Sequence, residues 1–180
     1  MVREAIAELK ADGIAISRRG SGLFVADLSD RNSFKVDRPA VLLPENVKQL
    51  FELRQPVEIS ATRFAAARRT DDDLQKLRRA HERMVAASDW AEEGVTADLQ
   101  FHQMIAAAAH NAYYLDFLGY LGGLMRESIQ VARAESRDSR VQGVTLEEHL
   151  NIFKGIESRD PERAAHAMMT HLEGARNRMS

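Results

Sequence analysis

Apolar side chains recur every three to four positions over most of the chain beyond residue 44, which is the spacing of one face of an α-helix. The pattern predicts about six helices joined by short polar segments. These helices are expected over 45–69, from 71, from 88, over 113–134, from 145 and from 161. Because no alternating strand pattern interrupts them, we expect an all-α fold, an antiparallel helical bundle of about six to seven helices.

Short polar signals mark where several of these helices begin. Thr70 precedes three aspartates, which is typical of an N-cap followed by an acidic first turn. Thr145 to Glu148 has the form of a capping box, and Asp160 precedes Pro161, a residue favoured at the first helical position. The polar stretch 133–144 is expected to be a loop or a frayed helix end, and Asn111 is expected to be the C-cap of the helix that precedes it.

The first 26 residues follow a different pattern. A helical apolar stripe ends near Gly13, and two short strand-like runs then flank a turn that contains Arg18 and Arg19. A helix followed by a hairpin with a basic tip is typical of the end of a winged helix-turn-helix. We therefore expect a partial DNA-binding domain over 1–26, a linker over 27–44 that is rich in turn formers, and the helical domain over 45–180.

Composition narrows the class of protein. The chain has 180 residues, 44% of them hydrophobic, and a net charge of −2, so it is not a nucleic-acid binder by overall charge alone. It has no cysteine, which excludes disulfides and thiolate-bound zinc and fits a reducing compartment. Neither a signal peptide nor an apolar run long enough to cross a membrane is evident, so a cytoplasmic protein without a membrane partner is expected.

Four side chains within the predicted bundle have the chemistry of a metal site. Asp98 and His102 are four residues apart, so they lie one turn apart on one helix face. His149 and His171 each interrupt an apolar helical pattern. A single histidine of this kind is more often a hydrogen-bonded core residue than a ligand. A buried aspartate, however, is costly without a cation, which favours a metal shared by the set.

Two segments near the N-terminus resemble the DNA-binding domain of the GntR family. Residues 2–9 are similar to the end of that family's recognition helix, and residues 19–25 are similar to its wing. The resemblance implies DNA contacts for Arg3, Arg19 and Gly20. The family has further helices before this point, so we expect either a mis-assigned start or a truncated chain. This chain is then expected to bind DNA weakly or not at all, and operator DNA is expected to be a partner of the full-length protein.

The helical region resembles the FadR-type effector-binding domain of one GntR subfamily. The similar residues are Leu53-Arg54 with Glu58, Asp98 and His102 followed by Asn111, Glu148-His149, Asp160 with Ala164-Ala165, and Met169 with His171. The resemblance implies a homodimer and a divalent metal held by Asp98, His102, His149 and His171. Zinc suits these donors best, although nickel, manganese or iron would also fit.

The same resemblance implies a small carboxylic acid as effector. Arg54 is expected either to pair with the acid or to form an intrahelical ion pair with Glu58, and Asn111 either to line the cavity or to cap a helix. The predicted function is a ligand-responsive, DNA-binding transcriptional regulator and not an enzyme. The alternatives are a metal-dependent, hydrolase-like enzyme and a stand-alone sensor domain. The sequence has no H-E-x-x-H motif that would favour the enzyme.

Overall fold

The computed structural model describes residues 2–11, 14–18, 20–26, 44–135 and 139–179. The chain divides into two compact units, Met1–Asp37 and Arg38–Ser180. The division falls inside the stretch that was predicted to be a linker, whose bounds stay a prediction.

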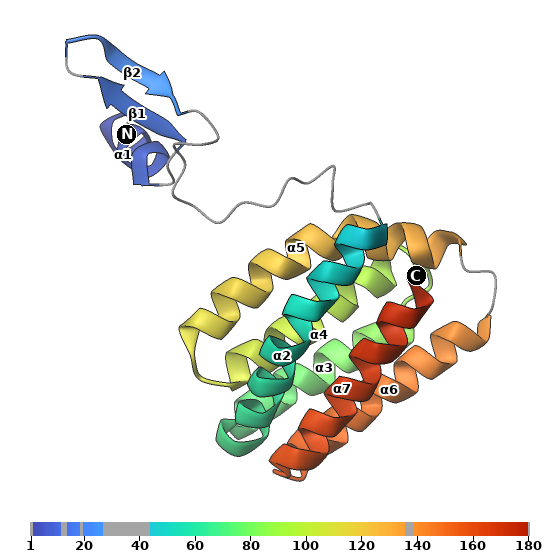
Figure 1. Ribbon diagram of the computed structural model, residues 1–180. Helices are drawn as coiled ribbons and strands as arrows, with labels where there is room; N and C mark the ends of the chain where they lie inside the picture. The colour runs from blue at the N-terminus through green and yellow to red at the C-terminus, as the bar shows by residue number, and fades with distance from the viewer. Residues whose placement is uncertain (1, 12–13, 19, 27–43, 136–138, 180) are drawn as a thin grey trace. The chain divides into compact units, whose positions relative to one another are not determined.

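The first unit contains one helix and a hairpin (Figure 1). Helix α1 spans Val2–Ala11 and contacts strand β1, Ala15–Arg18, which pairs antiparallel with β2, Gly22–Val25. Gly20 and Gly22 have φ angles of 78° and 104°, a backbone conformation that glycine adopts without a steric penalty. The described part of this unit therefore has the predicted form of a helix and a wing.

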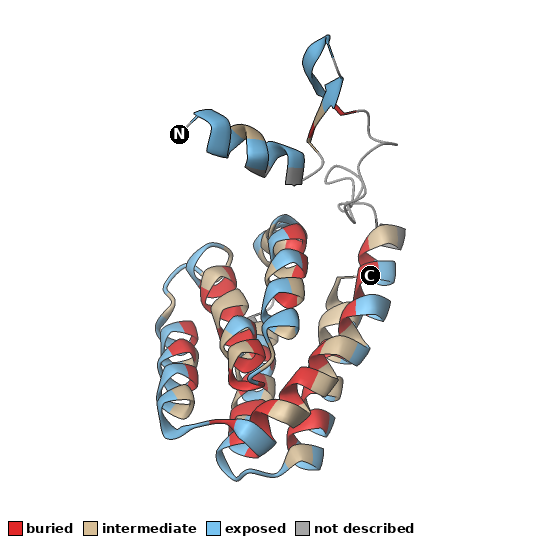
Figure 2. Cartoon of the chain, turned by 90° about the vertical axis from the view of Figure 1, so that its left-hand side faces the viewer, coloured by how far each residue is buried: buried red, intermediate tan, exposed pale blue. Residues whose placement is uncertain are grey.

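The second unit is a bundle of helices. They are α2 (Pro44–Arg68), α3 (Asp71–Ala86), α4 (Glu93–Ala108), α5 (Ala112–Glu135), α6 (Ser139–Glu157) and α7 (Pro161–Arg178). Helix α7 packs against α2 and α6, and α4 packs against α2, α3 and α5 (Figure 1). Buried residues gather on the helix faces that are turned toward one another (Figure 2). The predicted fold class, a helical bundle preceded by a helix and a hairpin wing, is confirmed.

Helix α4 lies at the centre of this packing and is buried on several sides. Its buried residues include Val95, Phe101 and Ile105, and also Asp98 and His102. Large apolar side chains from α3, α6 and α7 fill the core around it, among them Met84, Ile152 and Met168. Two polar residues of α4 therefore sit where transfer from water is costly unless they are paired.

Two predicted helix starts are correct. Thr70 caps α3 through a reciprocal capping box with Asp73, and the Asp160 carboxylate accepts a hydrogen bond from the Arg163 N–H at 3.0 Å at the start of α7. In both cases a side-chain oxygen satisfies an N–H group that has no partner within the helix.

Three local predictions are wrong. Helix α6 begins at Ser139, so Thr145 lies within it, and its hydroxyl donates to the Val141 carbonyl at 2.8 Å. Helix α4 begins at Glu93 because the Asp89 carboxylate accepts hydrogen bonds from the N–H groups of Ala91 and Glu92 and holds a turn before it. Asn111 lies at the start of α5, where its side-chain oxygen accepts a hydrogen bond from the Tyr113 N–H at 3.0 Å, and it does not end α4.

Within the described ranges, no helix is both long enough and apolar enough to span a bilayer.

Candidate metal centre

The structure brings the four candidate ligands together. Asp98 and His102 come from α4, His149 from α6 and His171 from α7. All four side chains are buried. Each contributes one possible ligand atom, and these four atoms lie within 4.8 Å of one another. Residues far apart in the sequence thus form one small polar cluster inside an apolar core.

Each histidine is oriented by a bond that its Nδ1 atom makes away from the cluster. The Nδ1 atom of His102 bonds to the Glu58 carboxylate, and that of His171 lies 2.9 Å from Glu148 Oε2. The Nδ1 atom of His149 lies 2.7 Å from the carbonyl oxygen of Thr145. Because the partner of Nδ1 decides which ring nitrogen carries the proton, all three histidines keep Nε2 as a donor atom for a metal.

Two of these Nε2 atoms have no hydrogen-bond partner among the described residues. They belong to His102 and His149, and both are buried. The Nε2 atom of His149 lies 3.1 Å from Asp98 Oδ1 but is poorly aligned for a hydrogen bond. Buried nitrogens without partners are costly in a folded protein, and a cation between them and Asp98 would remove that cost. One carboxylate and three imidazoles could hold a divalent metal ion.

Two glutamates support the cluster from behind. Glu58 bonds both Arg54 and His102, and Glu148 accepts hydrogen bonds from Arg178 at 2.7 and 2.9 Å as well as contacting His171. Burial alone would raise the pKa of each carboxyl group. The neighbouring arginine and histidine outweigh burial in both cases and lower the pKa of Glu58 and of Glu148 to about 2. Both side chains are therefore carboxylates at neutral pH.

The electrostatics of the cluster favour a neutral His171 imidazole and an ionised Asp98 carboxylate. Burial and the neighbouring His149 lower the pKa of His171 to about 3, against the opposing effect of Glu148. Burial would raise the pKa of Asp98, but its contact with His149 and the charge of Arg133 hold that pKa well below its usual range. Neutral imidazole and carboxylate are the protonation states in which these groups bind metal ions.

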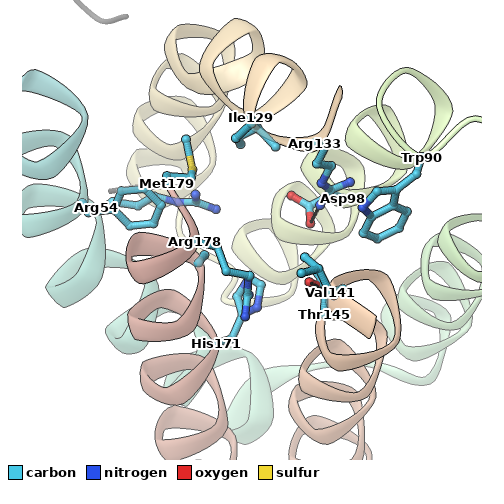
Figure 3. A pocket seen from close by; sticks show the side chains of 13 residues that line it. Arg54, Trp90, Asp98, Ile129, Arg133, Val141, Thr145, His171, Arg178 and Met179 are labelled. Carbon is cyan, nitrogen blue, oxygen red and sulfur yellow. Dashed lines mark hydrogen bonds and ion pairs between the residues drawn. The ribbon is translucent and has the colours of Figure 1, made fainter. Parts of the chain in front are cut away.

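A cavity of about 260 Å³ opens beside Asp98 and His171 (Figure 3). Its wall contains three arginines, Arg54, Arg133 and Arg178. Apolar side chains, which include Phe51, Ile129 and Met179, make up much of the remainder. A mostly apolar cavity with a few convergent cations is suited to a small organic anion.

The predicted effector residues have different locations. Arg54 lines the cavity and also pairs with Glu58, so both roles considered for it are compatible with its position. Asn111 does not line this cavity. It borders a separate hollow beside Tyr113 and Phe117, where its side chain caps α5.

The predicted DNA-contacting residues lie in the first unit. Arg3 is exposed on α1, and Gly20 is exposed in the turn of the hairpin. Arg19 lies outside the described residues.

Several residues of the site were not found from the sequence. Arg133, Arg178 and Trp90 line the cavity, and Glu148 contacts His171, a role that the sequence did not indicate. Glu148 lies on α6 and contacts a histidine of the neighbouring helix α7. The spacing of Arg54 and Glu58 was the one signal that suggested a supporting pair.

Comparisons with known proteins show to which family the chain belongs. The model of the FCD domain family matches residues 49–174. The HTH-type transcriptional regulator LutR of Bacillus subtilis is 30% identical over 184 residues, covering 99% of this chain and 83% of its own length. A solved structure of Streptococcus agalactiae GntR aligns with a TM-score of 0.66 and 25% identity, covering 98% of this chain and 80% of that chain. The chain belongs to the GntR family of transcriptional regulators, in the group that carries an FCD domain.

Another relative of this GntR-family chain is the putative L-lactate dehydrogenase operon regulatory protein of Escherichia coli. It is 29% identical over 177 residues, covering 95% of this chain and 68% of its own length. All four residues of the buried cluster lie within the stretch that matches the FCD domain.

Proposed function

We propose that this chain is a ligand-responsive, DNA-binding transcriptional regulator whose helical unit holds a divalent metal ion and binds a small carboxylic acid beside it. The observation that carries the proposal is the orientation of the three histidines. Each uses Nδ1 for a bond to the protein, which keeps Nε2 for the space shared with Asp98. Zinc is the metal that these donors favour.

The acid is proposed from the cavity and from the relatives. Three arginines line a cavity that also includes two of the proposed metal ligands, Asp98 and His171. A metal ion that has four protein ligands can take up a further ligand when its coordination number rises above four. A carboxylate of the acid can be that ligand. The relative named for an L-lactate dehydrogenase operon supports a small organic acid as the effector.

The hydrogen bonds of the nearby carboxylates favour a regulator over an enzyme. Among the described residues, Glu58 and Glu148 are the glutamates that contact the histidines, and each is held by an arginine as well. A general base needs a carboxylate that can reach a substrate or a metal-bound water. Carboxylates that are bonded to two cationic or donor partners are suited to positioning the histidines instead.

DNA binding is assigned to the first unit. Arg3 and Gly20 are exposed there, and Arg19 directly precedes Gly20 in the sequence. Operator recognition by a wing and a recognition helix normally uses two copies of the module, so a homodimer is proposed. Binding to an operator duplex should weaken steeply with added salt, because phosphate contacts release counterions.

The test of the metal site compares the unaltered chain with His149→Ala. His166, which is exposed on α7, supplies the control His166→Ala. Elemental analysis of purified protein should find about one zinc per chain in the unaltered protein and the control, and much less in His149→Ala. Equal metal content in all three proteins would remove the cluster from the proposal.

The test of the acid site is titration calorimetry on zinc-loaded protein with a panel of small carboxylic acids. At least one acid should bind, and Arg54→Ala should weaken it while leaving the metal in place. If no acid of the panel binds the zinc-loaded chain, the effector part of the proposal is wrong.

A further inference from the structure

Each of the three arginines of the cavity forms an ion pair with a different carboxylate. Arg54 is paired with Glu58, and Arg178 is paired with Glu148. Neither glutamate belongs to the four-residue cluster. Arg133 is paired instead with Asp98, at 2.8 Å from Nη2 to Oδ1, and Asp98 is one of the proposed metal ligands.

A metal ion therefore affects Arg133 differently from the other two arginines. Once Asp98 binds a divalent cation, its negative charge is shared between that cation and Arg133. Arg54 and Arg178 keep Glu58 and Glu148 as their partners. Among the residues that the structure describes, the charged ones that line the cavity are three arginines and one aspartate. A loaded centre thus adds a dication next to an arginine whose only paired carboxylate, within the described part of the chain, is already engaged.

Arg133 also has a donor without a partner. Its side chain is 10% exposed, and among the described residues nothing accepts a hydrogen bond from its buried Nη1 atom. The guanidinium lies over the ring of Trp90, with Cζ 4.0 Å from the ring centroid, so the indole fixes the plane of the group (Figure 3). A buried guanidinium N–H is costly without an acceptor, and an anion that enters the cavity beside it would supply one.

From these observations we infer that the effector is a dicarboxylate, and that Arg133, held by Trp90, is the residue that selects it. One carboxylate occupies the open position of the metal, and the second accepts hydrogen bonds from Arg133. This inference rests on the proposed function, because it assumes a metal in the cluster. It goes beyond the proposed function because it specifies that the ligand carries two carboxylates and that Arg133 binds the second one.

The test measures binding to the zinc-loaded chain by titration calorimetry. The probes are malonate, succinate and glutarate, each compared with the monocarboxylate of the same carbon number: propionate, butyrate and valerate. L-Lactate is included as an acid with a hydroxyl in place of a second carboxylate. The best dicarboxylate should bind at least about tenfold more tightly than its monocarboxylate counterpart and than L-lactate, because a second charge-assisted contact forms in a buried site.

The variant Arg133→Gln should remove that preference. Dicarboxylate affinity should fall by about tenfold or more, whereas monocarboxylate affinity should change by less than about threefold. Arg126→Gln is the matched control, since Arg126 lies on the same helix but donates to the Thr96 hydroxyl at 3.0 Å and does not line the cavity. Arg133→Lys, which keeps the charge but loses the planar fork, should recover part of the preference.

Because Arg133 also contacts Asp98, the zinc content of each variant is measured before titration, and only fully loaded protein is compared. Equal affinity for dicarboxylates and monocarboxylates in the unaltered chain would overturn the inference and leave the proposed acid sensor standing. Tighter binding of L-lactate than of any dicarboxylate would do the same. Absence of zinc, or of binding by any acid, would overturn the proposed function and the inference with it.

Discussion

At the scale of single residues, the centre depends on which nitrogen each histidine uses for the protein. A bond from Nδ1 to Glu58, to the Thr145 carbonyl or to Glu148 fixes both the ring orientation and the atom that is presented to the cluster. Such supporting bonds change metal affinity by roughly 10- to 100-fold when they are lost. The glutamates are therefore as much a part of the proposed site as the histidines that they hold.

The pKa shifts of the cluster predict that the metal-free protein loses stability in mild acid. The pKa of His171 is about 3 in the folded chain and 6.5 in its ordinary state, so the unfolded chain binds a proton first as the pH falls below about 6.5. For Glu58 and Glu148 the folded pKa is about 2 and the ordinary value 4.5, so their contribution is lost below about pH 4.5. All three effects have the same sign.

We expect the unfolding free energy of metal-free protein to fall by an amount on the order of 3 kcal/mol between pH 7 and pH 4. Urea titration at a series of pH values measures it. His171→Gln should flatten the upper part of this dependence, and the exposed His166→Gln should not. A stability that is constant from pH 7 to pH 4 would contradict the assignment of His171 as a buried neutral imidazole.

At the scale of elements, the close approach of α6 and α7 sets the distance between His149 and His171. Gly155 of α6 allows it, because a Cβ atom at this position would lie 2.6 Å from the Cα and 2.7 Å from the N atom of Ala164 in α7. Backbone atoms cannot move aside as the end of a flexible side chain can. This contact therefore holds the two helices at a fixed separation.

Gly155→Ala should destabilise the chain by about 1–3 kcal/mol, because the added methyl group forces the two helices apart. Gly143→Ala on the same helix is the control, since nothing lies within 4 Å of a Cβ there. That substitution should stabilise the helix by up to about 1 kcal/mol. Thermal or urea unfolding measures both, and a neutral Gly155→Ala would show that the helices are not held at this point.

The bundle could be predicted from the sequence because long apolar stripes and side-chain caps are local signals, as Thr70 and Asp160 show. The start of α6 could not be predicted. The polar stretch from Ser139 to Val144 has no apolar stripe, but it forms the first part of the helix. The four cluster residues were found from spacing and resemblance. The roles of Arg133, Trp90 and Glu148 were missed because they arise from contacts between elements that are distant in the sequence.

At the scale of the whole molecule, the centre joins most of the helical unit. Its four residues come from α4, α6 and α7, and the support of His102 comes from α2 through Glu58. An ion bound only by the folded form would therefore stabilise the whole bundle by mass action.

We expect a chelator to lower the melting temperature of the zinc-loaded chain and added zinc to restore it. At a free zinc concentration 100 times the dissociation constant, the stabilisation is about 2.7 kcal/mol. Differential scanning calorimetry measures the change, and magnesium, which prefers oxygen ligands, serves as the control ion. His149→Ala should melt at the same temperature with and without zinc. If zinc raised the melting temperature of His149→Ala as much as that of the unaltered chain, the stabilising ion would bind outside the cluster.

Trp90 is the single tryptophan of the chain, and its ring is stacked on Arg133 at the wall of the cavity. The tryptophan fluorescence of this protein consequently originates from one indole, which touches the residue proposed to select the ligand. An acid that draws the guanidinium toward itself changes the surroundings of that indole. The molecule thus carries a built-in optical reporter, and the occupancy of its cavity can be followed without any attached label.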